Sequence, residues 1–245
     1  MFHRLDSLRR RRGTRGSPNV QPEPNISWTE LRKFVSQVNH DLRNHLNAIE
    51  LQLACLSDIV REPEAGSEIK RLREMTADLC AHLQRLSTSL AGIRTNSMRY
   101  LAAEFFEDLR AKVALEEPEL AEEVEWKNSL GEEALEIDPH LLQEAFLELF
   151  CNAAAHERGE GALVFESRRE GESIEFILCE PKTKFDGETE NWGGRPLRQI
   201  RSGHYGLGLF RARSIFEAHH GTLRAQFDSA ASSLVTTVSL PILVA

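Results

Sequence analysis

Residues 31–60, LRKFVSQVNHDLRNHLNAIELQLACLSDIV, decide the fold of the first part of the chain. Apolar side chains recur every seven residues here, and further apolar side chains fill the positions between them. The first set is Val35, Leu42, Ile49 and Leu56, and the second is Leu31, Val38, Leu53 and Val60. A sustained heptad pattern is typical of a helix that packs on another helix along a continuous line. We therefore expect one long helix over this stretch.

A second helix is expected after a short break. The sequence EPEAG at 62–66 interrupts the first pattern, because proline and glycine end helices. After this break, side chains at alternating spacings of three and four residues are apolar except for one threonine. They are Ile69, Leu72, Thr76, Leu79, Leu83, Leu86, Leu90 and Ile93. A two-helix hairpin buries little surface alone, so we expect a homodimer in which two hairpins form a four-helix bundle. A hairpin that packs on the rest of its own chain is the alternative.

Composition limits the remaining possibilities. The run Arg9, Arg10, Arg11 and Arg12 stands among prolines and glycines, which predicts a disordered basic tail over residues 1–27, with membrane or nucleic-acid attachment as the alternative. The net charge of −8 argues against nucleic acid as the main partner of the chain. No apolar run has the length of a membrane span or signal peptide, which predicts a cytoplasmic protein. Four scattered cysteines predict reduced, mostly buried thiols and no metal cluster.

From residue 97 the pattern predicts a mixed α+β domain that extends to residue 245. We expect strands over 98–102, 124–130, 163–167, 174–179 and 234–240, and helices over 104–114, 139–156 and 207–219. Asp138 is placed to cap the second of these helices, and residues 169–172 form the turn of a β-hairpin. Helices interleaved with an antiparallel or mixed sheet predict a sandwich of helices on a sheet. The hairpin then occupies residues 28–96.

His40 occupies an outward position of the first heptad pattern. If Val35 is position a, His40 falls at position f, away from the apolar line, and Asp41 follows it directly. Neutral imidazole is a good nucleophile toward a phosphoryl group, and a neighbouring carboxylate can fix its tautomer and take up its proton. His45, in contrast, falls on the apolar line, where a structural role is expected.

The sequence HDLRNHLNAI at 40–49 resembles the H-box of sensor histidine kinases. The resemblance implies that His40 accepts the phosphoryl group and that Asp41 is its acid–base partner. It also implies that Asn44 occupies the polar position that many relatives use to dephosphorylate their response regulators. His45 stands where the family usually has proline.

Residues 148–156, ELFCNAAAH, resemble the N-box of the GHKL, or Bergerat, ATPase superfamily. The spacing of four places Glu148, Asn152 and His156 on one helix face, where an amide oxygen is a suitable ligand for Mg²⁺. A solvated polar face is the other interpretation of this spacing. The resemblance implies Asn152 as the Mg²⁺ ligand, Glu148 as its acidic companion and His156 as a residue near the phosphates of ATP.

The sequence GHYGLGL at 203–209 precedes a helix that ends at EAHHGTL, residues 217–223, similar to the family's G2 box and the segment that follows it. Glycine amides and a helix N terminus can surround a phosphate. The resemblance assigns Gly206, Leu207, Gly208 and Leu209 to this nucleotide contact. It also places Arg201, at the end of the expected ATP lid, where many relatives carry lysine.

The G1 box of the family is degenerate in this chain. Relatives have Asp-x-Gly-x-Gly after the strand that corresponds to 174–179, and the aspartate recognises adenine. Here the sequence is EPKTKF at 180–185, in which Glu180 can replace the aspartate as an acceptor but both glycines are absent.

Three functions follow from these motifs. The first is a histidine kinase that phosphorylates His40 from Mg²⁺ and ATP and transfers the phosphoryl group to a response-regulator receiver domain, with a separate protein as sensor. The second is an ATP-independent histidine phosphotransferase, or pseudokinase, whose second domain only binds partners. The third is an adaptor without phosphate chemistry. The intact N- and G2-boxes favour the first function, and the degenerate G1 box favours the second.

Overall fold

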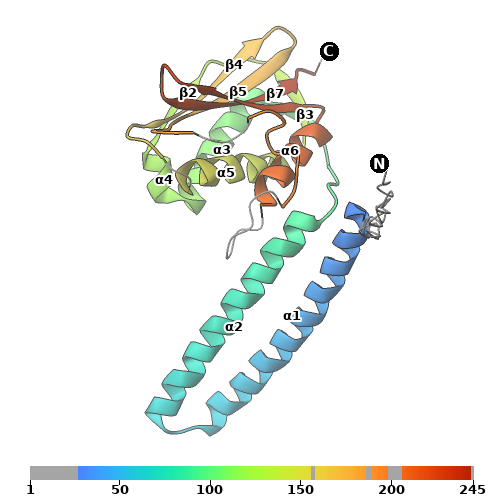
Figure 1. The fold of residues 1–245 in the computed structure, drawn as a ribbon, viewed down its shortest axis with the longest axis vertical. Coiled ribbons are helices and arrows are strands. Elements are labelled where there is room, and N and C mark those ends of the chain that lie inside the picture. The colour runs from blue at the N-terminus through green and yellow to red at the C-terminus, as the bar shows by residue number, and fades with distance from the viewer. Residues whose placement is uncertain (1–26, 156–157, 186–188, 198–205, 244–245) are drawn as a thin grey trace, which may run out of the picture.

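A computed structural model describes residues 27–155, 158–185, 189–197 and 206–243. It consists of a long helical hairpin and an α+β domain at one end of it, joined by an extended linker (Figure 1). The expected fold class is therefore confirmed. Among the described helices, none combines the length and apolar character needed to cross a membrane.

The hairpin comprises α1 (Trp28–Ile59) and α2 (Pro63–Leu90). Ser27 caps α1: its Oγ accepts a hydrogen bond from the Glu30 backbone N–H at 3.2 Å, and the Glu30 side chain accepts one from the Ser27 N–H at 3.0 Å. This reciprocal capping box satisfies amides that a helix otherwise leaves unpaired at its start. Pro63 occupies the first turn of α2, where its missing N–H costs nothing. The helices thus begin where local sequence chemistry favours a start.

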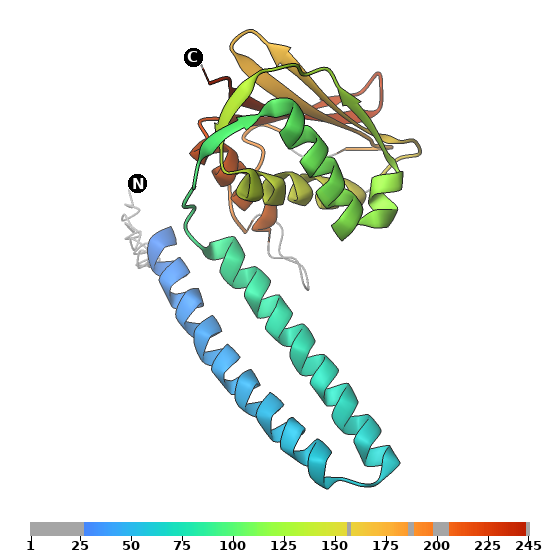
Figure 2. The same ribbon diagram turned by 180° about the vertical axis from the view of Figure 1, so that it is seen from behind.

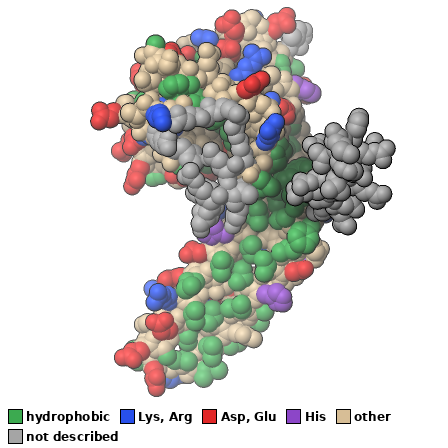
Figure 3. All heavy atoms as spheres, in the orientation of Figure 1, with side chains coloured by type: hydrophobic (Ala, Val, Ile, Leu, Met, Phe, Trp, Pro, Cys, Tyr) green, Lys and Arg blue, Asp and Glu red, His purple; other side chains and the backbone are tan. Residues whose placement is uncertain are grey.

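The apolar residues of the hairpin form two lines instead of one. Leu53, Ile69 and Leu90 are buried between α1 and α2. A second group remains exposed in the single chain: Phe34, Val38, Leu42, Ile49, Leu56, Leu72, Met75 and Leu79. Figure 3 shows hydrophobic side chains spread along both helices on one face. His45 is also exposed, so the structural packing expected for it is absent within the single hairpin.

The α+β domain begins with β1 (Met98–Leu101), α3 (Ala102–Glu116) and α4 (Pro118–Glu122). Then follow β2 (Val124–Asn128), β3 (Ala134–Ile137) and α5 (Pro139–Ala155). The final elements are β4 (Leu163–Glu170), β5 (Ser173–Pro181), α6 (Gly208–Ala218), β6 (Thr222–Asp228) and β7 (Ser233–Pro241). The sequence predictions omitted α4, β3 and β6.

Five strands form a mixed sheet in the order β2-β4-β5-β7-β6, in which only β2 and β4 are parallel. β1 and β3 form a separate antiparallel pair. The predicted turn between β4 and β5 is present, with Gly171 in the left-handed region at φ 61°. Figures 1 and 2 show α3, α5 and α6 on one face of the sheet.

The domain core lies between these helices and the sheet. Its largest fully buried side chains include seven phenylalanines: Phe105, Phe106, Phe146, Phe150, Phe165, Phe176 and Phe216. Phe146 of α5 contacts Phe176 of β5 at a ring-centroid distance of 5.2 Å and Phe216 of α6 at 5.0 Å. Such aromatic packing fixes α5 and α6 on the sheet with little freedom to shift.

The hairpin and the domain also contact one another beside the linker. Trp28 of α1 packs edge-on against Phe210 of α6, with ring centroids 5.7 Å apart. Arg32 donates a hydrogen bond to the Leu90 carbonyl at 2.7 Å, which satisfies the C terminus of α2.

The four cysteines are unpaired, and three of them are half-buried. Cys55 is exposed, contrary to the expectation that the cysteines are mostly buried.

Candidate functional site

His40 lies on the outer surface of α1 with its side chain 68% exposed. Its Nδ1 is 3.2 Å from Asp41 Oδ1 and 3.3 Å from Asn44 Nδ2. An ionised carboxylate can only accept hydrogen bonds, so the Asp41 contact requires the proton on Nδ1, whereas a hydrogen bond from the Asn44 amide nitrogen requires an unprotonated Nδ1. The two hydrogen bonds are therefore alternatives, and the Asp41 contact selects the tautomer with the proton on Nδ1. The nucleophilic lone pair then lies on Nε2. His40 therefore contacts each of the other two residues that the H-box resemblance singled out.

Two further residues support this arrangement, and sequence reasoning missed both. Gln37 Nε2 donates a hydrogen bond to the same Asp41 oxygen at 2.9 Å, so it holds the carboxylate that contacts the imidazole. The spacing of four between Gln37 and Asp41 is the signal that was available.

Asn39 is the second missed residue, and it is only 1% exposed. Its Nδ2 donates to the Leu83 carbonyl at 2.7 Å and to Ser87 Oγ, while its Oδ1 has no partner among the described residues. A buried amide that bonds across the hairpin fixes the rotation of α1 against α2. This rotation places His40, the next residue, on the outer surface.

The second group of candidate residues lies where α5 faces the start of α6. Asn152 Nδ2 donates to the Glu148 backbone carbonyl at 2.8 Å and to Glu148 Oε1 at 3.2 Å. The Asn152 amide nitrogen therefore makes its hydrogen bonds within α5. The Asn152 amide oxygen is the atom that could coordinate a cation such as Mg²⁺. Gly208 approaches so closely that a Cβ at this position would overlap the Glu148 carboxylate.

The G2 residues lie at the N terminus of α6. Gly206 is in the left-handed region at φ 62°, and Leu207 is buried immediately before Gly208 begins the helix. Leu209 lies in the first turn and is half-buried. Helix N termini present unpaired amides and a positive dipole end, which suits a phosphate. The structure therefore brings Glu148 and Asn152 together with Gly208, whereas His156 and Arg201 lie outside the described residues.

A network of hydrogen bonds fixes α5 relative to α6. Asp138 caps α5 as predicted, since its Oδ1 accepts from the Leu141 N–H at 3.1 Å. The Asp138 N–H in turn donates to Nε2 of His219 at 3.0 Å, and Nδ1 of His219 lies 2.8 Å from the Ile215 carbonyl. His219 is only 3% exposed and uses both ring nitrogens, so it is structural.

The G1 region contains a buried ion pair. Glu180 and Lys182 are 6% and 4% exposed, and Lys182 Nζ lies 3.3 Å from Glu180 Oε2. Burial raises the pKa of Glu180, and the charges of Lys182 and Arg158 act in the opposite direction. Arg158 also forms an ion pair with Glu123, and it was not identified from the sequence.

Gly159 extends this packed region. Its N–H donates to the Pro181 carbonyl at 2.8 Å, and a Cβ at Gly159 would lie 3.2 Å from the Lys182 backbone nitrogen. The carboxylate expected to accept from adenine therefore has a lysine as its partner, within a loop packed against residues 158–161. Glu148, Asn152 and Gly208 have the chemistry that a Mg²⁺–phosphate group would need, whereas the loop that begins at Glu180 does not fit adenine in this arrangement.

Comparisons with protein-family models and with curated proteins found no match to the sequence. Solved structures do match the fold. The full-length protein ShkA, crystallised in complex with AMPPNP, matches with a TM-score of 0.66 at 15% identity, over 87% of this chain and 46% of ShkA. The histidine kinase AdeS of Acinetobacter baumannii matches with a TM-score of 0.50 at 16% identity, over 83% of this chain and 98% of AdeS. The chain thus spans about half the length of ShkA.

Proposed function

We propose that the chain, whose fold is that of sensor histidine kinases, phosphorylates His40 from ATP and passes the phosphoryl group to an aspartate of a response-regulator receiver domain. The observation that carries the proposal is the geometry at His40. The imidazole is exposed, and its Nδ1 lies 3.2 Å from the Asp41 carboxylate, which accepts a hydrogen bond from Nδ1–H. Nε2 is thereby left as the nucleophilic nitrogen on the outer surface of α1.

The chemistry assigned to these residues is a phosphoryl transfer. Nε2 of His40 bonds to the γ-phosphorus as the bond from that phosphorus to the β,γ-bridging oxygen breaks, and ADP leaves. Asp41 stabilises the positive charge that develops on the ring, since it accepts a hydrogen bond from Nδ1–H. Mg²⁺ and ATP would supply the activated phosphate, with the Asn152 amide oxygen as a ligand of the metal.

The distance between the two sites requires the domain to move. His40 lies twelve residues beyond Trp28, which at 1.5 Å per residue is roughly 18 Å along α1 from the contact with α6. The Trp28–Phe210 contact and the Arg211 hydrogen bond to the Ala91 carbonyl at 3.5 Å hold the domain at the linker end of the hairpin. Transfer to His40 would require these contacts to open.

The exposed apolar line of the hairpin supports a homodimer. Val38, Leu42 and Ile49 on α1, with Leu72 and Leu79 on α2, are each at least 39% exposed in the single chain. Association of two hairpins along this line would bury these side chains and complete a four-helix bundle. His40 lies outside this line, so the bundle would leave it accessible to a receiver domain.

The buried pair of Glu180 and Lys182 favours a second candidate function, in which His40 exchanges phosphate with receiver domains without using ATP. The pair engages the residue that would recognise adenine. In this second function the domain retains its fold as a scaffold. The packing of Gly208 against Glu148 and the Asn152 contacts favour ATP use, because they belong to the phosphate half of the site.

Labelling separates the two functions. The full chain is incubated with Mg²⁺ and ATP labelled on the γ-phosphate, beside His40→Gln and Asn152→Ala variants. The kinase predicts acid-labile label that both substitutions abolish. No label from ATP, combined with acceptance of phosphate from a phosphorylated receiver domain only when His40 is present, would establish the second function. Failure of both donors would leave an adaptor and refute the proposal.

A further inference from the structure

His40 and three polar side chains share one exposed face of α1. Their spacing of i, i+3, i+4 and i+7 is that of residues on one side of a helix, and the four are Gln37, His40, Asp41 and Asn44. Asn39 turns this face outward, because its buried amide bonds to α2. The hydrogen bonds of the His40 ring are therefore made within this group.

Two partners compete for Nδ1 of His40. Asp41 Oδ1 lies 3.2 Å away and accepts from Nδ1–H, whereas Asn44 Nδ2 lies 3.3 Å away and donates to an unprotonated Nδ1. The first bond leaves the lone pair of the ring on Nε2. The second places the ring proton on Nε2 and removes the nucleophile of the proposed reaction. The choice of partner therefore decides whether Nε2 can react.

Helix geometry by itself does not favour the Asp41 contact. Residues four apart, such as His40 and Asn44, are neighbours on the surface of a helix, whereas adjacent residues do not face each other. His40 and Asp41 are adjacent in sequence. A further group must therefore turn the Asp41 carboxylate toward the ring.

Gln37 supplies this group. It precedes Asp41 by four residues, and its Nε2 donates a hydrogen bond to Asp41 Oδ1 at 2.9 Å. The same oxygen faces Nδ1 of His40. A carboxylate oxygen has two lone pairs, so it can accept both hydrogen bonds at once. The Gln37 amide therefore draws the carboxylate back along the helix and holds Oδ1 beside the ring.

We propose that Gln37 is a positioning residue for His40: it holds the Asp41 carboxylate against Nδ1 and so selects the tautomer whose Nε2 can attack a phosphoryl group. When the Gln37 hydrogen bond opens, the Asn44 amide competes for Nδ1, and the ring carries its proton on Nε2. The consequence for reactivity rests on the proposed phosphorylation of His40. The tautomer itself is a property of the unphosphorylated chain and can be measured separately.

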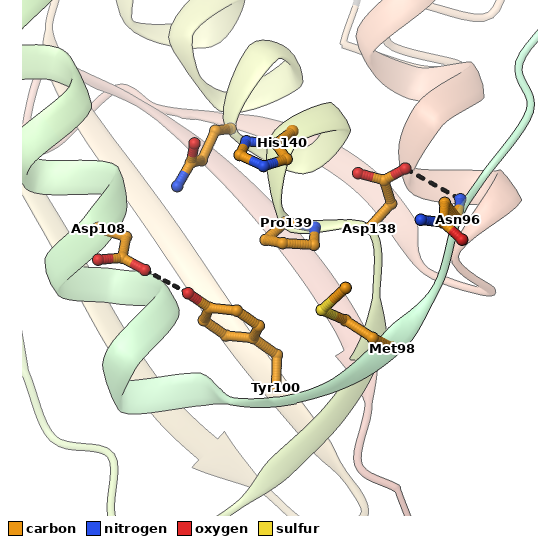
Figure 4. A pocket seen from close by; sticks show the side chains of 8 residues that line it. Asn96, Met98, Tyr100, Asp108, Asp138, Pro139 and His140 are labelled. Atoms are coloured by element: carbon orange, nitrogen blue, oxygen red, sulfur yellow. Dashed lines mark hydrogen bonds between the residues drawn. The ribbon is translucent and has the colours of Figure 1, made fainter.

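Nitrogen NMR of the full chain with ¹⁵N-labelled histidine measures the tautomer directly, because protonated and unprotonated ring nitrogens differ in chemical shift. The spectrum is recorded without nucleotide or receiver domain at about pH 8, where an ordinary imidazole is neutral. The His40→Gln variant identifies the His40 signals. His140, which lines a hollow on the α+β domain beside Asp138, is the internal reference (Figure 4).

Three variants separate the donor at position 37 from other effects on α1. Gln37→Met keeps a long side chain without a donor and should lower the ratio of the Nδ1–H to the Nε2–H tautomer by about twofold. Gln37→Lys keeps a donor four residues before Asp41 and should retain the wild-type ratio. Gln52→Met is the matched control. Gln52 is exposed and lies twelve residues beyond His40, roughly 18 Å along the helix, so the ratio should not change.

Removal of the competing amide should restore the tautomer. In Gln37→Met/Asn44→Ala, Asp41 is left as the partner of Nδ1, so the ratio should return toward the wild-type value. General loss of helix structure would not produce this recovery. The proposal is overturned by an unchanged ratio in Gln37→Met, by the same decrease in Gln37→Lys or Gln52→Met, or by no recovery in the double variant.

Phosphorylation of His40 provides a second readout. In Gln37→Met the initial rate with either phosphate donor should fall in proportion to the population of the Nδ1–H tautomer, at an unchanged half-saturating donor concentration. A rate that does not follow the tautomer would contradict the role of Gln37. If the tautomer shifts as expected but neither donor phosphorylates the wild-type chain, the proposed function fails while the selection of the tautomer by Gln37 stands.

Discussion

Replacement of Lys182 by methionine is the sharpest test of the buried pair in the G1 region. Glu180 and Lys182 are 6% and 4% exposed and 3.3 Å apart, so this substitution would leave Glu180 buried without its closest cation. Breaking one member of a buried ion pair costs about 3–5 kcal/mol. At about 2–4 °C per kcal/mol for a chain of this size, the melting temperature should fall by roughly 6–20 °C.

The same variant should show a defined pH dependence. Burial already raises the pKa of Glu180, and loss of the Lys182 charge raises this pKa further. Such a carboxyl group has a higher pKa in the folded state than in the unfolded state. At low pH it is protonated in both states, so its burial then does not lower the free energy of unfolding. As the pH rises past the unfolded pKa, folding must either retain that proton or bury the charge, so stability is lost. The destabilisation of Lys182→Met should therefore be smaller at pH 5 than at pH 8.

Urea unfolding at both pH values measures this effect, with Glu180→Gln/Lys182→Met as the control. The double variant removes both charges and should recover most of the lost stability, because a neutral pair needs no counter-ion. If Lys182→Met changes the unfolding free energy by less than about 0.5 kcal/mol at both pH values, the pair is not a buried interaction and the reasoning fails.

Three other substitutions test the remaining features. Gly208→Ala places a Cβ against the Glu148 carboxylate, the end of a flexible side chain, and should displace this carboxylate with little loss of thermal stability. The substitution should weaken stabilisation by Mg²⁺ and ATP, and an unchanged response to nucleotide would contradict the close approach. Asn39→Ala removes a buried amide that bonds to α2 and should lower the free energy of unfolding in urea by about 1–3 kcal/mol. An unchanged free energy of unfolding would show that the amide does not link the helices. Leu42→Glu places a charge on the exposed apolar line and should shift the sedimentation coefficient from that of a dimer to that of a monomer. Leu51→Glu, at another exposed position of α1, is the matched control. Equal sedimentation of the two variants would count against the proposed dimer surface.

The hairpin could be predicted from sequence because heptad spacing is a local property of the chain. The same spacing could not distinguish the two faces of α1. Leu53 packs within the hairpin while Val38 and Leu42 remain outside, and Asn39, a polar residue, occupies a position buried against α2. Which face of a helix meets which partner depends on both helices together. His45 falls at the same heptad position as Val38 and is likewise exposed in the single chain, so its expected packing role stays a prediction for the dimer.

In the α+β domain the N-box and G2 motifs predicted residues that the fold brings together, because Glu148, Asn152 and Gly208 are close through local helix spacing and one packing contact. The surroundings of Glu180 could not be predicted. The pairing of Glu180 with Lys182 depends on how the loop after β5 packs on residues 158–161, which are distant in sequence. The strand β6 was missed because its alternation of buried and exposed residues, with Thr222, Arg224 and Gln226 exposed, is weak in apolar character.

The central claim is that His40 carries a phosphoryl group on Nε2, and its most direct test is phosphorus NMR of the phosphorylated chain. The chain is first phosphorylated either with Mg²⁺ and ATP or with a phosphorylated receiver domain, and mass spectrometry locates the modified residue. We predict one acid-labile phosphoryl group on His40, with the chemical shift of an Nε2-phosphohistidine and no such signal in His40→Gln. A phosphoryl group on Nδ1 or on another residue, or no phosphorylation from either donor, would contradict the account.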